Sequence, residues 1–242
     1  MLGGMTMVDD SVVAAAADRV DVLDHGFVRL DASMADDLSV VNAARVSFAQ
    51  HVDELGERDQ GLIRFLMRER HGTPFEHNAL RFHIKCPIFV CREWQRHRIG
   101  SFNEWSARYS QLEPEFYLPE AEDVRTQVGK PGAYTFEQLD EATAEGVREA
   151  QRAVYEQAYA TYQGMIEQGV AKEIARNVLP VAIYTQFYWT VNARSLMNFV
   201  SLRNAETAQR EIRRFAEAVE SLFAGCMPIT HAAFVANDRK AP

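Results

Sequence analysis

Several features that mark whole classes of protein are scarce or missing in this sequence. Its 242 residues include three cysteines, Cys86, Cys91 and Cys226, an odd number that argues against a disulfide framework and fits reduced thiols. No apolar stretch approaches the roughly 20 residues that span a bilayer, and the N-terminal residues lack a secretory signal pattern. We therefore expect a cytoplasmic protein without a membrane partner.

Motifs for several common chemistries are also absent. No GxGxxG or GxxxxGK[ST] stretch occurs, which excludes a Rossmann or P-loop nucleotide site, and no GxSxG elbow supports a serine hydrolase. The histidines lack HExxH spacing and the cysteines lack a paired CxxC, so we expect no metal site. Because 26 Lys+Arg stand against 34 Asp+Glu, a formal charge of −8, a general nucleic-acid surface is disfavoured and any basic site must be local.

The hydropathy pattern predicts one α+β domain over residues 19–242, with residues 1–18 as a mobile lead-in. Strict alternation over 80–86 and 185–191 predicts two half-buried strands that could pair in a small antiparallel sheet, and a hairpin turns at Gly26. A long surface loop is expected over about 113–132. Flanking helices are expected over about 36–50, up to 71–72, after Pro87, and over 135–168, 172–179, 194–202 and 206–224.

The most unusual segment spans residues 92–109, where four arginines and two glutamates give a local positive surplus in an acidic chain. Arginine guanidinium groups bind phosphate oxygens in a bidentate way, so a nucleotide phosphate is a natural ligand. Glu104 can accept hydrogen bonds from a ribose hydroxyl or a heterocycle N–H. The alternative is a solvated helix face laced with salt bridges.

A second polar group lies in residues 192–203. Arg194 and Asn198 are one helical turn apart, whereas Arg203 falls about half a turn away from Arg194, which predicts that the two arginines serve different ligands or subunits. The alternative is an amphipathic helix with two exposed arginines. Arg176 has a similar ambiguity, because a cation near a helix C-terminus also compensates the helix dipole.

Residues 96–109, RHRIGSFNEWSARY, match the RHRxxSxNExSxRY signature of the flavin-dependent thymidylate synthases, and the chain resembles that family. Further matching blocks lie at residues 44–48, 73–77, 173–176 and 192–203, so the resemblance extends from about residue 19 to 228. It implies an α+β homotetramer with active sites at subunit interfaces and FAD bound across subunits. The implied reaction converts dUMP to dTMP, with 5,10-methylenetetrahydrofolate as carbon donor and NADPH as reductant.

The resemblance also implies roles for individual residues. The expected FAD contacts are Ser47, Thr73, Arg96, His97, Arg98, Glu104, Asn192, Arg194 and Asn198. The expected dUMP contacts are Glu93, Arg96, Glu104, Trp105, Ser106, Ala107, Arg108, Arg176 and Arg203. His71 is expected to face the flavin near the folate. Glu93 stands where the family often has Gln, and Gly72 where other members can carry larger residues.

The chemistry of these residue types agrees with the resemblance. Methylation of uracil requires C5 to become nucleophilic, and an arginine beside N3 and its neighbouring carbonyl can stabilise the developing negative charge. Arg203 is the candidate for this catalytic role. Two alternatives stay open: a non-catalytic nucleotide- or RNA-binding protein that uses the same arginines, and a flavin oxidoreductase that acts on another pyrimidine.

Overall fold

Two alternating segments form the centre of a five-stranded antiparallel sheet. In the computed structural model, which describes residues 19–130 and 132–242, β3 (Leu80–Pro87) pairs with β7 (Tyr184–Val191), and Phe82 lies opposite Trp189. The remaining strands are β1 (Arg19–Val22), β2 (Gly26–Ser33) and β4 (Ser101–Glu104), in the order β1-β2-β3-β7-β4. The α+β class and the predicted pairing of the two alternating segments are confirmed, whereas the predicted lead-in lies outside the described residues.

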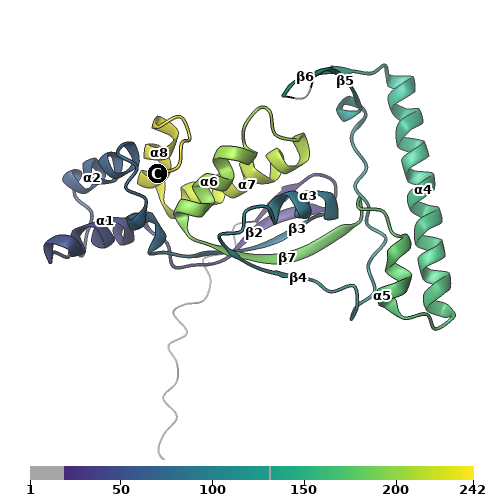
Figure 1. Ribbon diagram of the computed structural model, residues 1–242, viewed down its shortest axis with the longest axis horizontal. Helices are drawn as coiled ribbons and strands as arrows, with labels where there is room; N and C mark the ends of the chain where they lie inside the picture. The colour runs from purple at the N-terminus through teal and green to yellow at the C-terminus, as the bar shows by residue number, and fades with distance from the viewer. Residues whose placement is uncertain (1–18, 131) are drawn as a thin grey trace, which may run out of the picture.

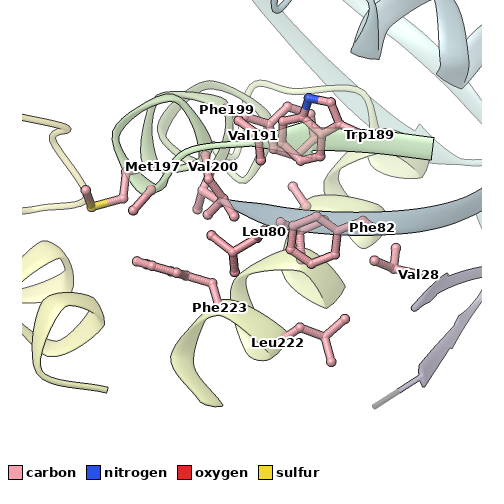
Figure 2. Packing of buried hydrophobic residues seen from close by; sticks show 14 of the residues in the cluster. Val28, Leu80, Phe82, Trp189, Val191, Met197, Phe199, Val200, Leu222 and Phe223 are labelled. Atoms are coloured by element: carbon pink, nitrogen blue, oxygen red, sulfur yellow. The ribbon is translucent and has the colours of Figure 1, made fainter. Parts of the chain in front are cut away.

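The alternation along these strands separates an apolar face of the sheet from a polar one. Phe82 and Trp189 are fully buried, while His83 and Tyr188 stack on the opposite face with ring centroids 5.0 Å apart. Three helices cover the apolar face: α3 (Ile88–Trp94), α6 (Ala193–Arg203) and α7 (Arg210–Cys226) (Figures 1 and 2). Each large side chain buried there contributes about 1.5–3 kcal/mol. The packing brings the start of α6 beside the loop that follows α3.

The other helices lie at the two ends of the sheet (Figure 1). At one end are α1 (Asp37–Arg45), α2 (Glu57–Arg68) and α8 (Pro228–Ala236), and at the other are α4 (Glu141–Glu167) and α5 (Lys172–Ala175). The buried carboxylate of Asp37 accepts hydrogen bonds from the amides of Ile229 and Thr230, both at 2.8 Å, and so joins α1 to α8. Short 3₁₀ turns cover Val46–Phe48, Thr73–Glu76, Ala121–Asp123 and Arg176–Val178.

The predicted surface loop at 113–132 is wrong in its second half, which belongs to a hairpin of β5 (Arg125–Lys130) and β6 (Ala133–Gln138). Nearly all side chains of this hairpin are exposed, so its sequence shows no alternation between apolar and polar residues. The helix predicted from 135 begins only at Glu141, because Asp140 caps it by accepting a hydrogen bond from the Thr143 amide at 2.9 Å.

Other element boundaries also differ from the predictions. The helix predicted over 36–50 ends at Arg45 and continues as a 3₁₀ turn, and the one predicted from 206 begins at Arg210. The four residues of β4 are too few to show a period, and α8 was not predicted.

Candidate functional site

A cleft of about 730 Å³ collects seven of the residues given site roles in the sequence analysis. We call it the arginine cleft. Four chain segments meet there: the segment after α2, the loop after α3, one side of α6 and the segment after α8. Its lining residues are Arg70, Glu76, Arg96, His97, Arg98, Ile99, Asn192, Arg194, Ser195, Asn198, Leu202, Arg203, Ala241 and Pro242.

The N-terminus of α6 is fixed by two asparagines. Asn192 caps the helix by accepting a hydrogen bond from the Ser195 amide at 2.9 Å, and Asn78 accepts one from the Ala193 amide at 2.7 Å. This holds Arg194 in the first turn of α6, where its guanidinium pairs with Glu76 and donates to the Pro242 carbonyl at 2.9 Å.

Gly72 leaves space for the side chain of Arg194. A Cβ atom at residue 72 would overlap Nε of Arg194, so the guanidinium would have to move. The missing side chain at residue 72 therefore makes room for the guanidinium.

The guanidinium of Arg203 is held by hydrogen bonds on three of its nitrogens. Nη1 donates to the Glu93 carboxylate at 3.0 Å, Nη2 donates to the Glu93 carbonyl at 3.0 Å, and Nε donates to Nε2 of His97 at 2.9 Å. Because arginine is only a donor, Nε2 of His97 must be the acceptor, which assigns the proton of the neutral ring to Nδ1. Two of the five guanidinium N–H groups are left for a ligand.

Burial perturbs the titration of both partners of Arg203. It lowers the pKa of His97 to about 4, with the positive charge of Arg203 adding to the effect, so the ring is neutral at pH 7. Burial also raises the pKa of Glu93, although the neighbouring Arg203 opposes the rise. Arg203 thus lies between a neutral imidazole and the carboxyl group of Glu93.

Arg194 and Arg203 line the same cleft, although helical phase predicts opposite sides of α6. Arg203 is the last residue of the helix, and its long side chain reaches back to Glu93 and His97. Helical phase fixes the direction of each Cα–Cβ bond but not the position of the end of a flexible side chain. The predicted separation of the Arg194 and Arg203 guanidinium groups therefore does not hold within one chain.

A second cleft, of about 520 Å³, lies beside the end of β4, and we call it the Ser106 cleft. The predicted residues in its wall are Glu104, Trp105, Ser106, Ala107 and Arg176. The Glu104 carboxylate is fixed on both oxygens: Oε1 accepts from Thr185 at 2.8 Å and Oε2 from Gln95 at 3.3 Å. Within the described part of the chain, Arg92 and Arg176 in this wall form no ion pair, so both can bind an anion.

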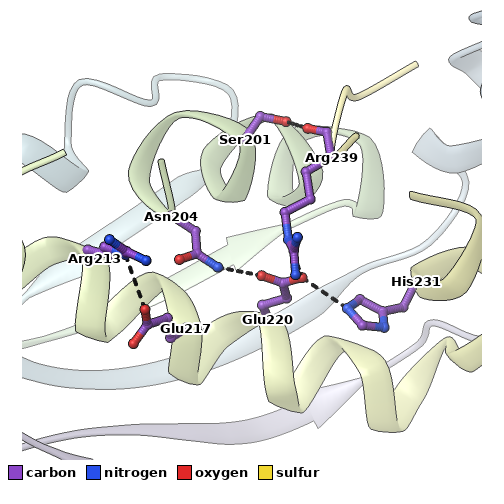
Figure 3. A network of polar contacts seen from close by, with 7 residues as sticks. All are labelled: Ser201, Asn204, Arg213, Glu217, Glu220, His231 and Arg239. Atoms are coloured by element: carbon purple, nitrogen blue, oxygen red, sulfur yellow. Dashed lines mark hydrogen bonds and ion pairs between the residues drawn. The ribbon is translucent and has the colours of Figure 1, made fainter. Parts of the chain in front are cut away.

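A polar network behind α6 holds the segment after α8 in place (Figure 3). The carboxylate of Glu220 accepts hydrogen bonds from Asn204 at 2.6 Å, His231 at 3.0 Å and Arg239 at 2.9 Å. Burial alone would raise the pKa of Glu220, but these three donors outweigh it and lower the pKa. Ser201 donates to the Arg239 carbonyl, and the segment then continues to Pro242 in the arginine cleft.

Some predicted residues lie outside both clefts. Ser47, His71 and Thr73 are exposed, and His71 packs edge-on against Phe65. Arg108 pairs with Glu173 at 3.1 Å. Glu93 lines neither of the two clefts and accepts a hydrogen bond from Arg203.

Other residues of the two clefts were not predicted. Glu76 belongs to the quoted block 73–77 but was given no role, and Arg92 was counted only as local charge. Arg70, Thr185 and Pro242 have no signal in the sequence that marks them.

Comparison with known proteins decides the family. The family model described as thymidylate synthase complementing protein matches residues 29–229. The chain belongs to this family. A flavin-dependent thymidylate synthase of Streptomyces coelicolor is 50% identical over 228 residues, covering 89% of this chain and 93% of the relative. One of Thermosipho africanus is 46% identical over 214 residues, covering 88% and 92%.

Solved structures agree with this assignment to the flavin-dependent thymidylate synthase family. A crystal structure of the UMP/dUMP methylase PolB from Streptomyces cacaoi bound with 5-Br UMP has a TM-score of 0.84 at 43% identity, covering 92% of this chain and 99% of that chain. The structure of PolB bound with 5-Br dUMP has a TM-score of 0.83 at 46% identity, covering 92% of this chain and 100% of that chain. The family resemblance inferred from residues 96–109 is thereby confirmed.

No group of three or more His, Cys, Asp or Glu side chains in residues 19–130 and 132–242 is arranged to hold a metal ion. Among the same residues, no helix has the length and apolar character needed to cross a membrane.

Proposed function

We propose that this protein methylates C5 of dUMP to form dTMP, with 5,10-methylenetetrahydrofolate as carbon donor and NADPH as reductant, through bound FAD in the cytoplasm. Family membership supports the reaction, and the arrangement of Arg203 between Glu93 and His97 is the observation that carries it. The alternative of a non-catalytic nucleotide- or RNA-binding protein is less well supported, because such a protein does not need a guanidinium fixed on three nitrogens.

The arginine cleft fits the cofactor. A pyrophosphate needs cations and N–H donors, and the cleft offers Arg96, Arg98 and Arg194 together with the amides of Asn192 and Asn198. When bound, FAD supplies the electron transfer that the side chains cannot perform. These residues are the proposed FAD contacts, along with Ser47, Thr73, His97 and Glu104, and His71 is proposed to face the flavin near the folate.

The proposed role of Arg203 is to stabilise negative charge on the pyrimidine. Its two remaining N–H groups can donate to the carbonyl oxygen beside N3, where negative charge develops as C5 becomes nucleophilic. Because Glu93 and His97 already orient the guanidinium, little reorganisation is required when charge develops. In this proposal Glu93 acts through Arg203, and Ser106, Arg108 and Arg176 bind the nucleotide together with Arg96 and the 104–107 stretch.

We propose that the protein is a homotetramer with active sites at subunit interfaces. Arg203 and Ser106 are both assigned to dUMP but line different clefts of one chain, which supports a site completed by a second copy. Ile99 and Leu202, in the wall of the arginine cleft, are 75% and 58% exposed, as expected for residues that another subunit covers.

Two experiments test these proposals. Purified protein should be yellow, and with NADPH and methylenetetrahydrofolate it should release tritium from 5-labelled dUMP and form dTMP. Colourless protein that binds no added FAD would refute the function.

The second experiment mixes variants that are inactive alone. Ser106→Ala and Arg203→Ala subunits, unfolded together and reassembled, should regain activity because mixed interfaces contain one intact pair of clefts. Absence of any recovery, with tetramers present by light scattering, would refute the shared site while leaving the reaction untouched.

A further inference from the structure

The loop after α2 contains an arginine in a backbone conformation that normally suits glycine. The His71 amide donates to the Leu66 carbonyl at 2.9 Å and the Arg70 amide to the Met67 carbonyl at 3.2 Å. This is the Schellman pattern of helix ends, and the residue at its left-handed position is Arg70, with φ of 59°. A side chain there is strained by its Cβ, so the fold alone would favour glycine.

The side chain of Arg70 forms no hydrogen bond or ion pair with the described residues. It is exposed and lines the arginine cleft. By contrast, Arg68 in the last turn of the same helix pairs with Glu69 at 2.8 Å and lies over the Phe65 ring. Of these two arginines, Arg70 at the strained position is therefore the one that can bind a ligand. Strain at a cleft is a recognised mark of function.

The balance of charge in the cleft leaves Arg70 without an assigned anion. Five arginines and one glutamate line it. Arg194 is paired with Glu76, and Arg203 with Glu93. The proposed contacts of the FAD pyrophosphate are Arg96 and Arg98, together with Arg194. Arg70 is left over, and it directly precedes His71, the residue proposed to face the flavin near the folate.

We propose that Arg70 binds an anionic group, carboxylate or phosphate, of a diffusible co-substrate in the arginine cleft. This rests on the proposed function, which supplies two sources of such a group. The folate donor ends in glutamate carboxylates, and NADPH carries a 2′-phosphate that NADH lacks. A guanidinium binds either group in a bidentate way.

The test is Arg70→Gly, which removes the guanidinium and supplies the residue that the backbone favours. The melting temperature should stay unchanged or rise by about 2–4 °C, so failure to fold does not confuse the result. The KM of one co-substrate should rise about tenfold, the effect of losing one charge-assisted contact, while kcat changes less than twofold.

The choice of co-substrates identifies the source of the anion. Loss of the preference for NADPH over NADH identifies the phosphate, and loss of the preference for triglutamyl over monoglutamyl folate identifies the carboxylates. Arg70→Lys keeps the positive charge and should retain part of the wild-type affinity for that co-substrate. Arg64→Ala, an exposed arginine of α2 outside the cleft, is the matched control and should change neither KM.

Two outcomes overturn the proposal. One is a variant whose KM values for both co-substrates stay within twofold of the wild type. The other is a loss of FAD affinity, measured by flavin fluorescence, as large as that of Arg194→Ala, which would make Arg70 a cofactor contact. Both presuppose an active wild type. A wild type that forms no dTMP contradicts the proposed function instead.

Discussion

Thr185→Val should weaken catalysis through Glu104 without disturbing the sheet. Thr185 is 3% exposed on β7, and its hydroxyl donates to Oε1 of Glu104 at 2.8 Å. Valine has nearly the same shape, so the change deletes one hydrogen bond to a carboxylate and leaves no cavity. Hydrogen bonds to charged groups contribute about 1.5–3 kcal/mol. If Glu104 orients dUMP, kcat/KM for dUMP should fall roughly 10- to 100-fold, since 1.4 kcal/mol corresponds to a factor of ten.

The assay is tritium release from 5-labelled dUMP over a range of dUMP concentrations, with FAD saturating. Thr185→Ser keeps the hydroxyl and should restore most of the activity. Thr190→Val is the matched control, because Thr190 lies on the same strand and faces β4 at Ser101, away from Glu104. Wild-type kcat/KM in Thr185→Val would show that Glu104 does not depend on this hydrogen bond, and the reasoning would be refuted.

Three further predictions concern cofactor affinity, stability and pH. Gly72→Ala should displace the Arg194 guanidinium and weaken FAD binding, measured by fluorescence quenching, toward the level of Arg194→Ala. Gly61→Ala is the control, because a Cβ atom at residue 61 meets no other atom within 4 Å, and it should leave FAD binding unchanged. Asp37→Ala should lower the free energy of unfolding in urea by about 3 kcal/mol, because two amides of α8 lose their acceptor. Asp36→Ala, which removes an exposed helix cap, is the control and should cost about 1 kcal/mol. Equal losses in the two variants would contradict this reasoning. The folded-state pKa of His97 is lowered to about 4, so its contribution to stability is present above about pH 6.5 and is lost as the pH falls toward 4. His97→Asn should therefore reduce the dependence of the melting temperature on pH between about 6.5 and about 4, whereas substitution of the exposed His77 by Asn should leave it unchanged. Identical plots of melting temperature against pH for His97→Asn and wild type would contradict the assignment.

The central strands could be predicted because burial leaves a direct trace in sequence. Phe82 and Trp189 alternate with polar neighbours since one face of the sheet is covered and the other is not. The hairpin of β5 and β6 left no such trace, because nearly all of its side chains are exposed. The prediction of strands therefore succeeded only where a core imposes a period.

The candidate site could be predicted by resemblance more than by local pattern. Arg203 meets Glu93 and His97 over a separation of more than 100 residues, which no helical or strand period encodes. The role of Thr185 was also hidden, because a polar residue in an alternating strand is expected to face solvent, whereas this hydroxyl is buried against Glu104. Long-range packing decides both arrangements.

The position of Pro242 has a practical consequence for recombinant work. This residue is buried in the arginine cleft, with its carbonyl on Arg194, and the network around Glu220 holds the segment that leads to it. An affinity tag joined to the chain beside Pro242 would enter the cleft and compete for the same guanidinium. Such a tag is therefore expected to lower the flavin content of purified protein, and cofactor measurements should use a tag placed elsewhere.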